Sequence, residues 1–511
     1  MLAKALSSAV IGIEAYLVEV EVDITSGLPV FTIVGLPETS VKESKERVKA
    51  AINNSGYIFP DDRITVNLAP ADIKKEGTGF DLPIALGILA ATKVIPQHLI
   101  SKYLILGELS LDGRIKPVKG SLSMALAAKG SEKAGIIVPY ENRHEASVVS
   151  GIKVFPAGTL SQVVDFFRGF NRIIPEKISL ESLFNKKNIY ESDFSEVMGQ
   201  EHVKRAMEIA ASGSHNLLMQ GPPGSGKSML AKRLPSILPD LTFEEAIETT
   251  KIYSVTGMIE NGQALITKRP FRSPHHTISD AGLIGGGHFP KPGEVSLAHN
   301  GVLFLDELTE FKKPVLEVMR QPIEDQKVTI SRASSTITYP SSFMLISAMN
   351  PCSCGFFGDP KHECKCTFQQ IRRYRSKISG PLLDRIDIHV EVPAVPYKDL
   401  AGEISSESSD EIRKRVSAAR DIQSQRFARA AIYCNSQMKS RHIRKHCKID
   451  KTSGIILERA IEKLGLSARA YNRILKISRT IADLEESPNI SSDHISEAIQ
   501  YRMLDRGKQF I

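Results

Sequence analysis

Residues 216–233 read NLLMQGPPGSGKSMLAKR, and this stretch sets the architecture that we expect for the chain. Its centre, 221–228, has the spacing G-x-x-x-x-G-K-S of a loop that wraps phosphates with backbone N–H groups. An apolar run precedes the loop, and a helix-like run whose N-terminus attracts anions follows it. We expect Lys227 to reach the β- and γ-phosphates of ATP and Ser228 to hold Mg²⁺. The other expected phosphate-binding residues are Gly221, Pro222, Pro223, Gly224, Ser225 and Gly226.

Two acidic residues follow another apolar run, VLFL at 302–305. A strand that ends in two carboxylates can place one on Mg²⁺ and the next on the attacking water, so we expect Asp306 to bind the metal and Glu307 to act as the general base. Asn350 ends the apolar run FMLISAM at 343–349. It would position the lytic water, or it is an ordinary turn residue before Pro351.

The region around these motifs alternates helix and strand. Apolar runs at 216–220, 301–305 and 343–347 predict the buried strands of a parallel sheet covered on both faces. Beyond residue 396 we expect helices at 411–427, 455–464, 468–484 and 492–503, the last with Ser492 as its N-cap. These patterns predict a P-loop α/β domain over 195–395 and a helical lid over 396–511.

The first 175 residues have a different pattern. The N-terminal stretch is interpreted as a first strand region and not as a signal peptide, because Glu14 interrupts its short apolar run. The strand-like runs are 16–24, 30–34, 64–67, 103–106 and 135–138. The apolar run 81–92 predicts a buried helix, which together with the strands indicates an α+β domain over 1–175. A polar linker is expected over 176–194.

Composition restricts the class of protein. Apolar residues make up 42% and charged residues 24% of the 511 residues, as in soluble globular proteins. No run of 18 or more apolar residues occurs, so we expect no membrane span and a cytoplasmic location. Much of the net charge of +8 lies at 411–447, which holds ten Lys/Arg and two Asp/Glu. This block favours an anionic partner such as nucleic acid, or it is a solvated helical face.

Long motifs spread along the chain carry a family resemblance. They are the P-loop, VSLAHNGVLFLDE, VTISRASSTITYP, SAMNPC and SGPLLDRIDIHVEVP. Together they resemble the magnesium-chelatase-like AAA+ proteins, and more closely the YifB/competence protein ComM family of DNA branch-migration helicases. The resemblance covers essentially the whole chain.

The resemblance implies roles for residues that spacing alone does not distinguish from unpaired surface groups. Arg385 matches an arginine finger that acts on the nucleotide of a neighbouring subunit. Arg469, with Arg473 as a neighbouring alternative, matches a sensor arginine for the subunit's own nucleotide, and Asn350 matches sensor 1. A finger supplied in trans requires a ring, and the family implies a homohexamer.

Two inserts are expected to face the channel of that ring. One is 270–287, and the other is 327–339, whose alternating sequence also predicts a β-hairpin by itself. Lys327 and Arg332 would touch a DNA backbone in the channel, or they are solvated edge residues.

The stretches 73–91 and 107–142 resemble the proteolytic domain of the Lon family. The Lon nucleophilic serine aligns near Gly79 and its lysine near Leu122, so neither partner of a Ser–Lys dyad is present. We expect a Lon-like fold, of the ribosomal S5 domain 2 type, without peptidase activity.

Four of the six cysteines have the pattern C-x-C, nine residues, C-x-C. They are Cys352, Cys354, Cys364 and Cys366. Four thiolates at this spacing predict a structural Zn²⁺ site, with His362 as a spare ligand candidate, whereas free thiols or a redox pair are the alternatives. Because the cluster directly follows Asn350, we hypothesise that it couples this residue to the pore or to a neighbouring subunit.

The resemblance implies an ATP-hydrolysing DNA motor with ATP, Mg²⁺ and structural Zn²⁺ as cofactors. It would act as a helicase that drives branch migration on single-stranded or branched DNA, and so promote integration of incoming DNA by homologous recombination in natural transformation. A chelatase-type motor and a protein-remodelling ring are the alternatives. The Lon-like region argues against the first, because the resemblance implies that chelatase motor subunits lack it. The intact set of Lys227, Asp306, Glu307 and Arg385 argues against an inactive scaffold.

Overall fold

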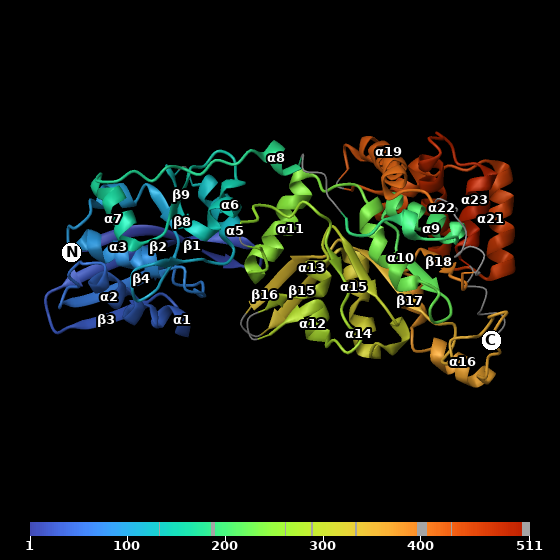
Figure 1. Ribbon diagram of the computed structural model, residues 1–511, viewed down its shortest axis with the longest axis horizontal. Helices are drawn as coiled ribbons and strands as arrows, with labels where there is room; N and C mark the ends of the chain where they lie inside the picture. The colour runs from blue at the N-terminus through green and yellow to red at the C-terminus, as the bar shows by residue number, and fades with distance from the viewer. Residues whose placement is uncertain are drawn as a thin grey trace. The chain divides into compact units, whose positions relative to one another are not determined.

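The computed structural model describes residues 1–131, 133–184, 190–260, 262–287, 290–332, 335–395, 406–430 and 432–502. The chain divides into two compact units: Met1–Lys187 with Thr242–Thr267, and Asn188–Leu241 with Lys268–Ile511 (Figure 1). The expected linker and lid fall partly outside the described residues, at 185–189, 396–405, 431 and 503–511.

The first unit is built on a mixed sheet of seven strands. In spatial order these are β3 (Val30–Val34), β4 (Arg63–Ala69), β2 (Glu14–Thr25), β1 (Leu2–Ile11), β5 (Tyr103–Ile105), β8 (Gly135–Pro139) and β9 (Val154–Ala157). β1 and β2 form the antiparallel hairpin at the N-terminus, so the interpretation of that stretch as a strand region is confirmed. The other four predicted strands are also present, and β9 was not predicted.

Helices complete this α+β unit. They are α1 (Thr39–Lys42), α2 (Ser44–Asn54), α3 (Asp81–Ala91), α4 (Gln97–Ile100), α5 (Ser121–Lys129), α6 (Arg143–Ser147), α7 (Leu160–Arg168), α8 (Leu180–Phe184) and α11 (Phe243–Thr256). Every residue of α3 is buried, as its continuous apolar run predicts, and α3 packs on β1 and β2. The packing is close, because a Cβ at Gly87 would lie 2.6 Å from Val22 Cγ2.

The helix α11 belongs to this unit although it follows the P-loop in sequence. It packs against α5, and the backbone N–H of Gly120 donates to the Ser254 carbonyl over 3.2 Å. Ser254 also donates to the buried carboxylate of Glu145, which accepts from the Ser121 hydroxyl over 2.5 Å. These hydrogen bonds tie α11 to α5, since losing a donor would leave a buried acceptor oxygen unsatisfied.

The second unit contains a sheet of five strands in which every neighbouring pair is parallel. In spatial order the strands are β11 (Phe271–Arg272), β14 (Val302–Leu305), β17 (Met344–Met349), β10 (Leu217–Gln220) and β18 (Ile388–Glu391). The three predicted strands are confirmed as β10, β14 and β17. Since all five point the same way, their carboxyl ends meet at one edge, where open α/β sheets bind ligands.

The C-terminal helices share one hydrophobic core with this sheet. The helices around it are α9 (Glu201–Gly213), α10 (Lys227–Arg233), α19 (Ser409–Phe427), α20 (Ser440–His446), α21 (Lys451–Leu464), α22 (Ala468–Leu484) and α23 (Ser492–Gln500). Four helices were predicted, and α20 was missed. The predicted N-cap Ser492 is wrong: the hydroxyl of Ser491 accepts from the His494 N–H, so Ser491 is the N-cap and Ser492 is the first residue of the helix.

Asp387 joins the helices to the amino ends of the strands. Its carboxylate accepts from the backbone N–H of Asn216 over 3.1 Å and forms an ion pair with Arg473 of α22. Burial would raise the pKa of Asp387, but Arg473 and His215 outweigh burial and hold this pKa well below its usual value.

This pair predicts a large stability effect. Asp387→Asn leaves Arg473 as an uncompensated buried cation, so we expect a loss of about 3–5 kcal/mol in the free energy of unfolding. Urea unfolding followed by circular dichroism measures it, since the chain has no Trp. The control is Asp410→Asn, which breaks the exposed pair with Arg413 and should cost at most about 1 kcal/mol. Equal losses in the two variants would contradict this account of the Asp387 pair.

Candidate nucleotide and metal sites

The P-loop connects the end of β10 to the start of α10. Gly224 and Gly226 have φ angles of +74° and +87°, which residues with a side chain rarely adopt. Gly221 is required for a different reason, because a Cβ there would lie 2.1 Å from the Val392 carbonyl oxygen. The loop conformation therefore depends on all three glycines that the sequence motif contains.

Lys227 lies across the mouth of this loop. Its ammonium group donates to the carbonyl oxygens of Gly221 and Pro222 over 2.8 Å each, and to Asn350 Oδ1 over 3.2 Å. Burial lowers the pKa of Lys227, and the nearby Asp306 carboxylate opposes this shift. The structure thus brings Lys227 and Asn350 together at the place where a γ-phosphate is expected.

Ser228 and Asp306 face each other across the carboxyl ends of β10 and β14. The Ser228 hydroxyl donates to Asp306 Oδ2, and the Glu307 backbone N–H donates to Asp306 Oδ1 over 2.9 Å. The hydroxyl in the first turn of α10 and the carboxylate that follows β14 are hard oxygen ligands of the kind that Mg²⁺ prefers. These residues therefore fit the expected magnesium ion.

Glu307 has a left-handed backbone with φ of +51°, an uncommon conformation for a residue that is not glycine. Its carboxylate is contacted by His276, whose Nδ1 lies 3.3 Å from Glu307 Oε2. The His276 ring also packs edge-on against Phe311. From the sequence, His276 could be assigned only to the insert that is expected to face the channel. Its contact with Glu307 is tertiary, and no local sequence pattern predicts such a contact.

Three arginines lie away from this P-loop, toward the amino ends of the strands. Arg385 precedes β18, is buried, and forms a 2.6 Å ion pair with Glu324. Arg473 is held by Asp387, and Arg469 is exposed one helical turn before it on α22. The structure does not bring Arg385, Arg469 or Arg473 to the nucleotide motifs of the same chain, and their roles stay predictions.

The four expected cysteine ligands converge. The Sγ atoms of Cys352, Cys354, Cys364 and Cys366 all lie within 4.8 Å of one another. Cys352 Sγ lies 3.3 Å from Cys354 Sγ and 3.7 Å from Cys364 Sγ, close to the separation of about 3.8 Å that tetrahedral Zn–S bonds impose. The backbone N–H of Phe356 lowers the pKa of the Cys354 thiol to about 6. The Cys366 backbone N–H lowers the pKa of the Cys364 thiol, but burial and the Cys354 and Cys352 side chains outweigh it and raise this pKa to about 12. The residues fit a zinc ion, and the spare candidate His362 pairs with Asp359 instead.

The two expected inserts lie side by side. Strands β15 (Lys327–Arg332) and β16 (Ser335–Pro340) form the predicted hairpin, and the Tyr339 hydroxyl donates to the Pro290 carbonyl over 2.6 Å. The short strands β12 (Gly285–Gly286) and β13 (Lys291–Pro292) form a second hairpin against it, with Arg332 Nη2 lying 3.3 Å from a Cβ built at Gly286. Lys327 and Arg332 are exposed, as is Lys291, which the sequence did not single out.

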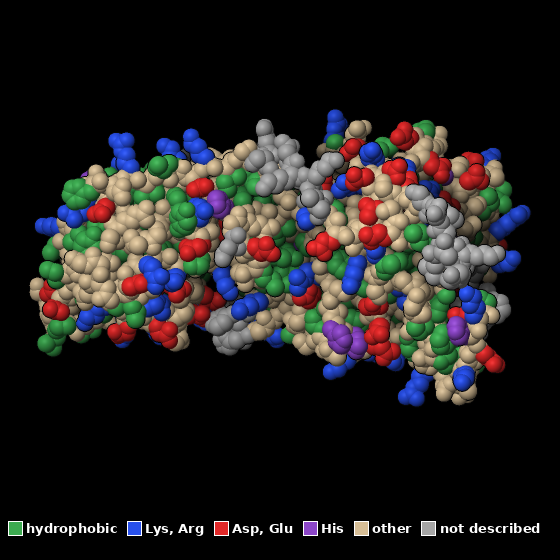
Figure 2. All heavy atoms as spheres, viewed as in Figure 1, with side chains coloured by type: hydrophobic (Ala, Val, Ile, Leu, Met, Phe, Trp, Pro, Cys, Tyr) green, Lys and Arg blue, Asp and Glu red, His purple; other side chains and the backbone are tan. Residues whose placement is uncertain are grey.

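Part of the basic block at 411–447 is paired with acidic residues inside the chain. Arg415 pairs with Glu208 and Glu407, Arg426 pairs with Asp483, and Arg413 pairs with Asp410. On the face shown in Figure 2, Lys and Arg side chains are interspersed with Asp and Glu, and no broad basic area stands out. These pairs reduce the positive charge that the block presents to a partner.

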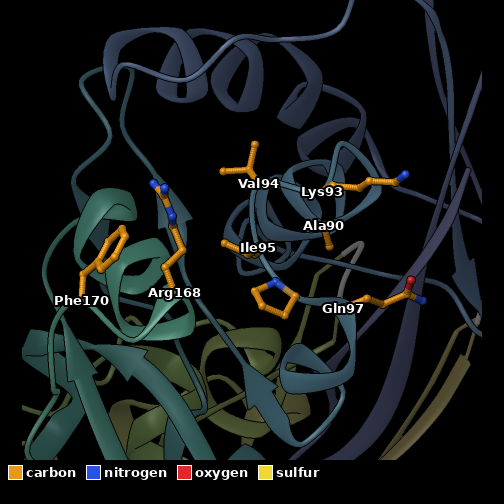
Figure 3. A pocket seen from close by; sticks show the side chains of 8 residues that line it. Ala90, Lys93, Val94, Ile95, Gln97, Arg168 and Phe170 are labelled. Carbon is orange, nitrogen blue, oxygen red and sulfur yellow. The ribbon is translucent and has the colours of Figure 1, made fainter.

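A hollow of about 410 Å³ lies in the first unit, beside the ends of α3 and α7 (Figure 3). Residues 93–97 line one side, and Arg168 and Phe170 line the other, with the Arg168 guanidinium 4.7 Å from the Phe170 ring centre. Its lining offers no carboxylate, thiol or hydroxyl for hydrolytic chemistry, whereas the nucleotide motifs all belong to the second unit.

Three family models match the chain. They are described as magnesium chelatase, subunit ChlI (residues 193–400), subunit ChlI of Mg-chelatase (residues 20–142) and magnesium chelatase, subunit ChlI C-terminal (residues 406–502). The match of 20–142 removes the expected argument that a Lon-like region separates this chain from chelatase subunits.

Two similar proteins match over nearly their whole length, and a third matches over a shorter region. Competence protein ComM of Haemophilus influenzae is 45% identical over 509 residues, which cover 99% of this chain and 98% of ComM. YifB of Escherichia coli is 44% identical and covers 98% of this chain and 96% of YifB. Lon protease 2 of Bacillus subtilis is 30% identical over 129 residues, covering 25% of this chain and 23% of the protease.

Within the described residues, no helix is both long and apolar enough to cross a membrane.

The contact of His276 with Glu307 predicts a kinetic effect. We expect His276→Ala to lower kcat for ATP hydrolysis by about ten- to hundredfold with little change in KM, since it leaves the base poorly oriented. His276→Asn, which keeps a hydrogen-bonding group, should recover part of the rate. The control is His144→Ala, because His144 pairs with Glu176 in the first unit, whereas the His275 ring centre lies only 4.1 Å from that of His276. Steady-state kinetics that show the same rate for both alanine variants would refute the positioning role.

The cysteine geometry predicts about one zinc ion per chain. Cys352→Ser and Cys364→Ser should each reduce zinc, measured by elemental analysis, to near zero. Cys434→Ser should retain it, because Cys434 is buried outside the cluster. Full zinc content in the first two variants would show that these thiols do not bind the metal.

Proposed function

Because the chain belongs to the ComM/YifB family of magnesium-chelatase-like AAA+ proteins, we propose that it is an ATP-driven motor on single-stranded or branched DNA. It acts in the cytoplasm as a hexameric ring, with helicase or branch-migration activity. The observation that carries the ATPase part is the meeting of Lys227, Ser228, Asp306, Glu307 and Asn350 at one edge of the parallel sheet.

Each of these groups has a place in hydrolysis. Ser228 and Asp306 would hold Mg²⁺, which supplies neutralising charge on the phosphates when it is bound. Lys227 stabilises charge on the γ-phosphate oxygens, while Asn350 orients the attacking water. Glu307 accepts the proton that this water loses as its oxygen bonds to the γ-phosphorus and the bond to ADP breaks.

The arginines at the opposite edge of the sheet support a ring. A four-residue strand spans about 13 Å, so Arg385 at the amino end of β18 is far from its own P-loop. In a ring it faces the nucleotide of the next subunit once its ion pair with Glu324 opens. The position of Arg469 favours the neighbour's nucleotide too, although the family resemblance implies a role in its own site.

Adjacent hairpins supply the proposed DNA contact. Lys327, Arg332 and Lys291 are exposed cations on two hairpins that pack on each other, as backbone-directed DNA binding needs. The segment that follows β11 contains both His276 and the β12–β13 hairpin. DNA that displaces this hairpin would therefore move the residue that contacts Glu307, which links DNA binding to hydrolysis.

The role in natural transformation rests on the relative. The Haemophilus protein is named a competence protein, and at 45% identity over 99% of this chain we propose the same process here. The motor would extend recombination intermediates and so promote integration of incoming DNA.

The first unit would not be a peptidase, because Gly79 and the buried Leu122 occupy the positions of the Lon dyad.

A chelatase-type or protein-remodelling ATPase is the second candidate, favoured by the three family models named for a chelatase subunit. Such a motor would use the same nucleotide site with another partner. DNA dependence of ATP hydrolysis separates the two candidates, since only the first requires DNA to contact the hairpins.

The test is ATP hydrolysis with and without forked DNA. We expect the wild type to be stimulated about tenfold or more, because arginine fingers and the base act fully only in the assembled ring. Glu307→Gln should bind ATP and fail to hydrolyse it. The double variant Lys327→Ala/Arg332→Ala should keep the basal rate and lose the stimulation. A basal rate that is indifferent to DNA would reject the DNA motor in favour of the second candidate.

A further inference from the structure

We propose that metal binding by the four-cysteine segment, residues 352–366, sets the affinity of the P-loop for nucleotide. This segment, which we call the knuckle, contacts the P-loop from one side and continues from Asn350 on the other. The inference rests on the proposed nucleotide site and adds to it a metal ion as a determinant of ATP and ADP binding.

The first cysteine pair fixes the turn beside the sensor residue. Cys352 stands two residues after Asn350 and is fully buried. The Gly355 backbone N–H donates to the Cys352 carbonyl over 3.1 Å, and Cys354 Sγ lies 3.5 Å from Cys364 Sγ. A metal shared by these sulfurs therefore determines where Gly355 lies.

Gly355 packs directly on the P-loop. A Cβ at this position would lie 2.5 Å from Pro223 Cδ and 2.7 Å from Pro223 Cγ, so only glycine allows the approach. Pro223 immediately precedes Gly224, whose positive φ the phosphate-binding conformation needs. The knuckle thus packs on the P-loop at Pro223, next to Gly224, whose backbone conformation is one that a side chain would disfavour.

The second cysteine pair leads into a helix that closes on the same region. Helix α16 (Phe368–Arg375) begins after Cys366 with a capping box at Thr367. Arg375 Nε donates to the Pro351 carbonyl over 3.2 Å, and its guanidinium lies 5.3 Å from the Phe357 ring centre. Tyr374 accepts from the Thr309 hydroxyl over 2.6 Å, and Thr309 follows Glu307 by two residues.

Loss of the metal would loosen both the contact of Gly355 with Pro223 and the contacts that α16 makes. Four clustered thiols without an ion have no bond to hold the two C-x-C pairs together, and closing their loop then costs chain entropy. Gly355 would leave Pro223, and the P-loop would visit conformations in which its N–H groups do not converge on phosphate. Preorganisation of a binding loop is a large part of its affinity, so nucleotide binding weakens.

Two glycines in the knuckle provide a matched pair of variants. Gly355 and Gly358 have φ angles of +88° and +83°, but a Cβ at Gly358 would meet nothing within 4 Å. Both alanine variants carry the same backbone strain, and only Gly355→Ala pushes against Pro223. We expect Gly355→Ala to weaken ADP affinity by about tenfold or more while zinc is retained. Gly358→Ala should keep both zinc and wild-type affinity.

Metal removal supplies a second measurement on the wild-type chain. After zinc is chelated and the protein is returned to buffer with Mg²⁺, ADP affinity should fall, and amide hydrogen exchange over 221–228 should accelerate. Adding Zn²⁺ back should restore both. If Gly355→Ala loses zinc or fails to fold, this measurement decides the matter.

The outcomes separate the two proposals. Equal ADP affinity for Gly355→Ala and Gly358→Ala with zinc bound, or unchanged affinity and exchange in the zinc-free wild type, overturns the knuckle's role and leaves the ATPase intact. A zinc-loaded wild type that binds no nucleotide overturns the proposed function itself, and the inference with it.

Discussion

The parallel pairing of β14, β17 and β10 is the constraint on which the site depends. It places Asp306, Asn350 and the P-loop at the carboxyl ends of three adjacent strands, within hydrogen-bond reach of Ser228 and Lys227. Parallel strands need long crossover connections, so these groups come from segments far apart in the chain. A one-residue slip of β17 against β10 would turn its side chains to the opposite face and move Asn350 away from Lys227.

Features that depend on a short stretch of sequence could be predicted, whereas features that depend on contacts between distant residues could not. The P-loop, the acidic pair and the four cysteines are short motifs whose spacing already expresses their chemistry, and the strands β10, β14 and β17 are continuous apolar runs. By contrast, β11 has two residues and too little pattern to detect, and the Ser254–Glu145 bond that ties α11 into the first unit joins residues 109 apart in sequence. The contact of His276 with Glu307 is likewise tertiary. The internal partners of the basic block are tertiary too, because charge counting does not show that Arg415 pairs with Glu208 or that Arg426 pairs with Asp483.

The same parallel order that gathers the hydrolytic groups keeps the arginines apart from them. Asp387 anchors Arg473 where β18 begins, and Arg385 lies two residues before this acid. The helices after residue 406 pack into the core of the sheet, and Arg473 of α22 is held there by Asp387. In the proposed ring, each subunit binds nucleotide at the carboxyl edge of its sheet and presents arginine side chains at the amino edge. Such a site is complete only between two copies, which makes hydrolysis dependent on assembly.

Each strand end in the site also begins an appended element. The segment after β11 carries His276 to Glu307 and continues into the hairpin beside Arg332, while the segment after β17 carries Asn350 to Lys227 and continues into the cysteine knuckle against Pro223. Glu307 and the phosphate-binding loop are thus contacted from two sides by elements for which we propose ligands other than nucleotide. A ligand on either element changes the nucleotide site only if the contact is rigid, and close packing of His276 on Phe311 and of Gly355 on Pro223 provides that rigidity. Under the two proposals, DNA on the hairpins and a metal ion in the knuckle would therefore control ATP hydrolysis without a separate signalling domain.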